Sequence, residues 1–217
     1  MKKNVLVVGP ALSRSGYGEQ TRLALRALRS REDLFNVFII PTIWGGTGWL
    51  VETDEEREWI DQRIIETQNR NSHGIGYDAS IQVDIPWAPP PPDNPNAVTG
   101  WRPMTDHDIG FTAGIETNKI SPQWVESTQK VKKIIVVSEH SKNVFNETVY
   151  TATDRRTGRQ MQIGNKTPVD VVGFPFRDIE AETVELELKH DFNFLVMAQW
   201  CRRKNLENTV KWFLEEF

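Results

Sequence analysis

Short apolar runs separated by helical segments are the feature that most constrains this chain. The run from Val5 to Val8 is continuously apolar and is followed by Gly9-Pro10, a pattern typical of a strand buried on both faces of a parallel sheet. Further strands are predicted at residues 35–40, 80–85, 109–115, 133–137, 169–172 and 192–198. Helices are predicted at about 19–29, 53–68, from 121 onward, 138–149 and 205–217. This alternation predicts an α/β fold with a Rossmann-like, mostly parallel sheet flanked by helices.

Polar side chains mark the expected starts of three of these helices. Thr53 with Glu56 three residues later forms a capping box, and Ser121 and Ser138 are suitable N-cap residues. The polar stretch 151–167 is expected to form a hairpin that turns near 156–158. The first helix carries a basic stripe that we expect to face solvent, formed by Arg22, Arg26 and Arg29.

An acidic stretch divides the chain into two parts. Residues 1–177 are predicted to form an N-terminal Rossmann-like domain, and residues 178–191 a linker. Residues 192–217 would supply only the first strand and helix of a second half, which is then truncated. The last helix is expected to turn Val210, Phe213 and Leu214 inward, and its apolar face is also a candidate for self-association.

Charge and cysteine content exclude several classes of protein. The formal net charge of −4 argues against broad, non-specific binding of nucleic acid. The one cysteine, Cys201, leaves no intramolecular disulfide and fits a reducing compartment. Asn4 is followed by only four apolar residues, too few for a secretory signal or a membrane span, so we expect a cytoplasmic protein. The histidines are scattered without metal-ligand spacing, so no metal site is predicted.

The turn between the first strand and the first helix is the first candidate site. Ligands of such sheets bind beyond the carboxyl ends of the strands, where Gly16, Tyr17 and Gly18 stand in this chain. The two glycines would let the backbone approach a phosphate or a sugar, and the helix start would supply free N–H groups. On the simpler alternative, the glycines only make a turn.

A nicotinamide-dependent enzyme is disfavoured by the same region. The dinucleotide fingerprint requires a third glycine where this chain has Thr21. It also requires an acidic residue after the second strand, which here ends at Ile40 and is followed by Pro41 and Thr42. Both absences count against a dehydrogenase. The missing acidic residue also makes another nucleotide-using Rossmann enzyme, such as an epimerase, a weak alternative.

Two further stretches place charged residues just beyond predicted strand ends. Glu116 follows a strand of small residues, where a carboxylate can bind a hydroxyl group or act as a catalytic base. Arg203 and Lys204 stand at the start of the last helix, where fixed cations and helix N–H groups suit a diphosphate. The alternatives are an exposed loop acid and a solvated basic turn.

The order of four segments resembles that of GT-B glycosyltransferases, particularly the retaining glycosyltransferase family 4. These segments are residues 15–22, 116–124, 134–142 and 203–205, and the resemblance extends over most of the chain from residue 3 to 217. The family histidine near the end of the fourth or fifth strand has no match, since residues 114–117 occupy that region.

The resemblance implies two Rossmann-like halves with a cleft between them. The N-terminal half would bind a glycan or other hydroxyl acceptor, and the C-terminal half a nucleotide-diphosphate sugar as donor substrate. Gly16 and Gly18 would line the cleft, and Lys204 would contact the diphosphate with help from Arg203. No metal ion or other cofactor is implied, because protein cations and helix N-termini stabilise the leaving diphosphate.

Two hypotheses follow from the sequence. The first is a glycosyltransferase of hexosyltransferase type, or a fragment of one, in which Glu116 orients the acceptor hydroxyl group. The second is a non-catalytic glycan-binding or assembly module derived from a GT-B half, because most of the donor-binding half lies outside these residues. The chain is then either part of a longer gene product or a protein that has lost its second half.

Overall fold

The computed structural model describes residues 1–51, 53–90, 92, 99–154, 156–176, 180, 185–198 and 200–217. These residues form two compact units, Met1–Phe176 and Arg177–Phe217. Residues 178, 179 and 181–184 of the predicted linker lie outside the described residues.

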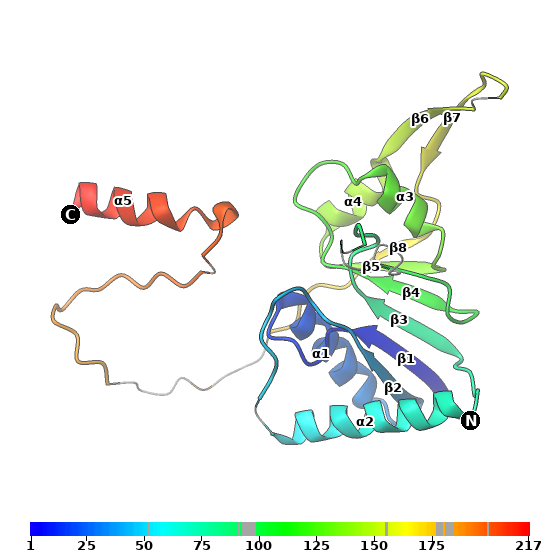
Figure 1. Ribbon diagram of the computed structural model, residues 1–217, viewed down its shortest axis with the longest axis horizontal. Helices are drawn as coiled ribbons and strands as arrows, with labels where there is room; N and C mark the ends of the chain where they lie inside the picture. The colour runs from blue at the N-terminus through cyan, green and yellow to red at the C-terminus, as the bar shows by residue number, and fades with distance from the viewer. Residues whose placement is uncertain are drawn as a thin grey trace. The chain divides into compact units, whose positions relative to one another are not determined.

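A parallel sheet of six strands forms the centre of the first unit (Figure 1). The strand order is β2-β1-β3-β4-β5-β8, and every pairing between neighbours is parallel. The strands are β1 (Lys3–Gly9), β2 (Phe35–Pro41), β3 (Ala79–Val83), β4 (Asp108–Phe111), β5 (Lys133–Val136) and β8 (Val169–Val171). The predicted Rossmann-like α/β class is therefore confirmed.

The described residues of this unit form four helices: α1 (Gly16–Arg29), α2 (Glu55–Ser72), α3 (Pro122–Thr128) and α4 (Glu139–Glu147). The Ser121 and Ser138 side chains accept hydrogen bonds from backbone N–H groups of α3 and α4, which confirms both predicted caps. The predicted cap of α2 at Thr53 is wrong by one residue. The Asp54 side chain accepts from the N–H of Arg57 instead, and its negative charge is favoured at a helix N-terminus.

The start of α1 and the end of β4 differ from the sequence prediction. Helix α1 begins at Gly16 rather than near Glu19, because the Ser15 side chain caps it by accepting from the N–H of Gly18. Strand β4 ends at Phe111 rather than at residue 115. The backbone of Gly114 has a φ of +87°, a left-handed conformation that cannot continue a strand.

Each face of the sheet carries its own apolar cluster. On one face, Val7, Leu25 and Ile60 join β1, α1 and α2. On the other face, Ile134 and Phe145 join β5 and α4 in a cluster that also contains α3. Both clusters consist of residues with almost no solvent exposure, so burial of apolar surface fixes the helices on the sheet.

The predicted solvent-facing basic stripe on α1 is wrong. The Arg22 side chain is buried and its Nη1 donates to the carbonyl oxygens of Ala11 and Ser13, at 2.8 and 3.0 Å. Arg26 forms ion pairs with Glu19 and Glu56, and Arg29 pairs with Glu55, with distances in the range 2.5–2.7 Å. Periodicity identified the face correctly, but that face contacts α2 and the first loop rather than water.

The hairpin predicted within 151–167 is confirmed. Strands β6 (Val149–Thr153) and β7 (Gln160–Gly164) form a separate antiparallel pair that extends from the unit in Figure 1. Its turn contains Gly158 with a φ of +68°.

The second unit contains the short 3₁₀ helix η1 (Arg202–Lys204) and helix α5 (Leu206–Glu216), which confirms the predicted last helix. The strand predicted at 192–198 is wrong, since these residues form no strand and no described segment of the unit pairs with them. Val210, Phe213 and Leu214 are exposed instead of facing inward. Phe194 does contact Phe213, with ring centroids 5.1 Å apart.

None of the helices in the described part of the chain has the length and apolar character needed to cross a membrane.

Gly18 is expected to be required for folding, whereas Gly16 is not. A Cβ atom at Gly18 would lie 2.0 Å from the backbone oxygen of Ser13, while one at Gly16 would meet nothing within 4 Å. Gly18→Ala should therefore lower the free energy of unfolding by about 1–3 kcal/mol, as overpacking does. Gly16→Ala is the matched control and should leave stability unchanged or slightly raised. Urea denaturation followed by circular dichroism would measure both, and equal midpoints for the two variants would refute the assignment.

Candidate functional site

A cavity lies where the strand order of the sheet reverses. The chain passes from β1 outward to β2 and then returns across β1 to β3, so β1 and β3 flank the topological switch point. Ligands of open α/β sheets bind at such points, beyond the carboxyl ends of the strands. The cavity found there has a volume of about 440 Å³. It is lined by Val8, Thr42, Ile43, Trp44, Gly45, Gln82, Asp84, Ile85, Ala88, Thr99, Gly100 and Arg102.

Partly buried hydrogen bonds hold one wall of this cavity. The Gln82 side chain on β3 donates to the carbonyl oxygen of Arg102 at 2.7 Å and accepts from the N–H of the same residue at 2.9 Å. Further along, the Asp108 carboxylate accepts from the N–H groups of Met104 and Thr105. The Gln82 and Asp108 side chains therefore fix the backbone around Arg102 against the sheet.

Asp84 is the most unusual residue of the cavity. Its Oδ1 accepts from the N–H of Ile85 at 2.7 Å. Within the described parts of the chain, the carboxylate makes no other hydrogen bond and no ion pair. Burial raises the pKa of Asp84 from the ordinary value of 3.8 to about 6, against smaller lowering effects of the Ile85 N–H and the Arg102 charge. A partly buried carboxyl group without an ion-pair partner, in a cavity at the end of a central strand, is a mark of a functional site.

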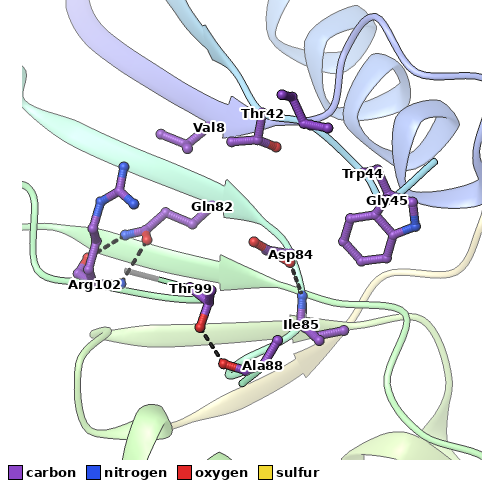
Figure 2. Close-up of a pocket in the computed structure, with 12 residues that line it drawn as sticks. Val8, Thr42, Trp44, Gly45, Gln82, Asp84, Ile85, Ala88, Thr99 and Arg102 are labelled. Atoms are coloured by element: carbon purple, nitrogen blue, oxygen red, sulfur yellow. Dashed lines mark hydrogen bonds between the residues drawn. The ribbon is translucent and has the colours of Figure 1, made fainter. Parts of the chain in front are cut away.

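An aromatic side chain forms another wall. The Trp44 ring stacks on Tyr17, with centroids 4.2 Å apart and an angle of 25° between the rings. The Tyr17 hydroxyl group in turn hydrogen bonds to Thr112 Oγ1 at 2.8 Å and accepts from the N–H of Ala113. Burial raises the pKa of Tyr17, so the hydroxyl group keeps its proton at neutral pH. Figure 2 shows Trp44, Gln82 and Asp84 around the same cavity.

The residues of the first predicted turn have different positions. Gly16 is exposed and has open space around it, so a ligand could approach its backbone. Gly18 is buried against the backbone of Ser13, so its lack of a side chain serves internal packing. Tyr17 does not line the cavity itself but supports Trp44, which does.

The other predicted site residues are all exposed. Glu116 lies in the segment after β4 and forms no hydrogen bond or ion pair with any described residue. Arg203 and Lys204 belong to η1 in the second unit, where no residue of this short helix is buried. Among the residues that the structure describes, no group of three or more His, Cys, Asp or Glu side chains could hold a metal ion.

Sequence reasoning missed Trp44, Asp84 and Arg102 as site residues. A signal for Asp84 was present, because it is the first acidic residue after a buried strand. The strand was predicted to continue to residue 85, which placed Asp84 inside it, whereas β3 ends at Val83. Arg102 lies in a loop and is brought to the cavity by hydrogen bonds to Gln82, which no local pattern indicates.

Comparison of the chain with protein-family models, curated proteins and solved structures gave no match. The topology defines the class of protein, an α/β chain with a Rossmann-like parallel sheet. Its function has to be argued from the cavity.

Asp84 should make the stability of the protein depend on pH between about 4 and 6. Its folded-state pKa lies above the ordinary value, so the folded protein binds more protons in this range and loses stability as the pH rises. A difference of about two pKa units corresponds to about 3 kcal/mol at most. Asp84→Asn should remove this loss and be more stable than the unchanged protein at pH 7, with little difference at pH 4. Denaturation curves at several pH values would test this, and parallel pH profiles would contradict it.

Proposed function

We propose that the first unit binds a sugar, or another acceptor rich in hydroxyl groups, in the cavity at the switch point. We further propose that it acts as the acceptor side of a glycosyltransferase that uses a nucleotide-diphosphate sugar. The observation that carries this proposal is the combination, in one cavity, of the Trp44 ring with the Asp84 carboxyl group, which has no ion-pair partner among the described residues.

The lining of the cavity suits a sugar ring. A pyranose has an apolar face, which stacks on indole, and a rim of hydroxyl groups, which donate and accept hydrogen bonds. Trp44 supplies the aromatic surface, while Thr42 and Thr99 offer hydroxyl groups. A volume of about 440 Å³ is within the range of small-molecule sites.

Asp84 is placed to receive the proton of the acceptor. In the transfer, the acceptor oxygen forms a bond to the anomeric carbon of the donor, and the bond from that carbon to the diphosphate oxygen breaks. The hydroxyl proton would pass to the Asp84 carboxylate, whose pKa of about 6 leaves it mostly ionised but still basic at neutral pH. Asp84 replaces Glu116 in this role because it lines the cavity and Glu116 is an exposed loop residue.

The donor side of the proposal depends on the second unit. Arg203 and Lys204 are cations at the beginning of the last helical segment. We propose that they stabilise the negative charge of the leaving diphosphate. No metal ion is required in this scheme. The single cysteine fits a reducing compartment such as the cytoplasm.

A second candidate function is glycan binding without transfer. It is favoured by the exposure of η1 and α5, in which no residue is buried. Arg203 and Lys204 therefore do not lie in an enclosed donor site within these helices. The apolar residues exposed on α5, including Phe213 and Leu214, are consistent with an assembly role through this helix.

Removal of the Trp44 ring should weaken sugar binding. Trp44→Ala is expected to lower affinity about tenfold, the loss of one aromatic contact. Trp49→Ala is the matched control, since Trp49 lies in the same loop, is exposed and does not line the cavity. Binding would be measured on a glycan array and then by calorimetry with the sugars retained. An array without any bound glycan, or equal losses in both variants, would count against the site.

Asp84→Asn should abolish transfer while sugar binding persists. The chain would be incubated with a panel of uridine-, guanosine- and thymidine-diphosphate sugars and the bound acceptor, and products detected by mass spectrometry. Glu116→Gln tests the assignment suggested by the sequence, and loss of transfer in that variant alone would restore it. Sugar binding with no transfer from any donor would favour the second candidate function.

A further inference from the structure

A second cavity lies beside the first on the same face of the sheet. Its volume is about 400 Å³. It is lined by Leu6, Ile40, Asn71, Gly74, Ile75, Gly76, Tyr77, Arg102, Pro103 and Met104. A smaller apolar cluster on this face, separate from the one around Ile134, consists of strand and loop residues, with Tyr77 and Met104 packed against Leu6, Val8 and Phe38. No helical residue of the described chain belongs to that cluster, and the end of α2 borders it through Arg70 over Phe38 and through Asn71.

The register of two strands places the cavities end to end. On β1, Val8 lines the first cavity and Leu6 the second; on β2, Thr42 follows the strand and lines the first cavity, whereas Ile40 lines the second. Residues two apart in a strand point to the same face and are separated by about 7 Å. The second cavity therefore continues the first by one such step toward the amino ends of the strands.

Arg102 lines both cavities and stands at their junction. Its backbone is fixed by the pair of hydrogen bonds to Gln82, but its guanidinium group makes no hydrogen bond or ion pair with any described residue. A guanidinium group carries five N–H donors. Arg102 thus offers unpaired donors, on a backbone that is held in place, to a ligand that occupies both cavities.

The chemistry of the second cavity also suits a sugar ring. Asn71 and Tyr77 supply polar groups joined by a hydrogen bond of 2.6 Å, in which the Tyr77 hydroxyl donates to Asn71 Oδ1. Arg70 lies over the Tyr77 ring and fixes it from the α2 side, 5.3 Å from the centroid. Leu6 and Ile40 form an apolar floor. A cavity with an apolar floor and polar walls suits a sugar ring, which has one apolar face and a polar rim, better than it suits a hydrocarbon chain.

We infer that the acceptor is an oligosaccharide of at least two sugar units. The reacting unit lies beside Asp84 and Trp44, and the neighbouring unit lies over Leu6 and Ile40 with Arg102 donating to both. This inference rests on the proposed function, because it extends the same acceptor site by a second subsite.

Gly76→Phe fills the second cavity and leaves the first unchanged. Gly76 lines the second cavity, and a Cβ atom there meets nothing within 4 Å. The matched control is Gly173→Phe, because Gly173 has equal free space but lines a different cavity, between α1 and the sheet. Ile75→Trp is a second filling variant, since Ile75 is half exposed and lines the same cavity as Gly76.

The probes are mono-, di- and tetrasaccharides of glucose, galactose, mannose and N-acetylglucosamine, first on an array and then in calorimetry. The unchanged chain and Gly173→Phe should bind the preferred disaccharide at least about tenfold more tightly than its monosaccharide. In Gly76→Phe and Ile75→Trp this preference should disappear while monosaccharide affinity is retained, which also shows that the variants are folded.

Two outcomes would overturn the second subsite: equal affinity of the unchanged chain for mono- and disaccharides, or a disaccharide preference that survives both filling variants. Either result leaves monosaccharide binding, and with it the proposed function, intact. Failure of the unchanged chain to bind any saccharide would instead refute the proposed function, and the second subsite with it.

Discussion

Burial of Arg22 beneath the first turn is the interaction on which the rest of the site depends. Its guanidinium group donates to two carbonyl oxygens of the turn and pairs with Glu19 at 2.8 Å. The turn held in this way binds the loop after β2, because the Leu12 carbonyl oxygen accepts a hydrogen bond from the N–H of Leu50. That loop carries Trp44 onto Tyr17. A buried arginine that does not line the cavity therefore determines where the aromatic wall stands.

The same turn explains why the glycines serve packing more than ligand binding. Gly18 lets α1 begin directly against the backbone of Ser13, which places Tyr17 in the first turn of the helix. From there the Tyr17 hydroxyl group reaches Thr112, beyond the end of β4. The helix start therefore connects the loops after β1, β2 and β4, and the cavity forms among segments that are already fixed to one another.

The fold could be predicted from sequence because its signals are local. Apolar runs such as the one from Val5 to Val8 and caps such as Ser138 are read within a few residues, and they give the strands and helices of the first unit. The strand expected at 192–198 failed because a strand depends on neighbours, which a local pattern cannot supply. For the same reason the basic stripe of α1 was expected to face solvent, although Arg22 is buried under the first turn and Arg26 and Arg29 pair with α2.

The site could be predicted only in part, because it is assembled from loops far apart in sequence. Trp44, Asp84 and Arg102 follow three different segments, and only the strand order brings them to one cavity. The first turn was correctly expected to lie at this edge of the sheet, but its contribution is indirect, through Tyr17.

The charged groups of Asp84 and Arg102 distinguish this cavity from a simple packing defect. An asparagine at position 84 would keep the hydrogen bond from the Ile85 N–H and would avoid the unfavourable burial of a carboxylate. An aliphatic residue at 102 would keep both backbone bonds to Gln82. Neither charged group therefore improves the stability of the fold, and the two form no ion pair with each other. Buried or fixed polar groups of this kind are expected where a ligand completes their hydrogen bonds, and a sugar chain with hydroxyl groups along both cavities would do so.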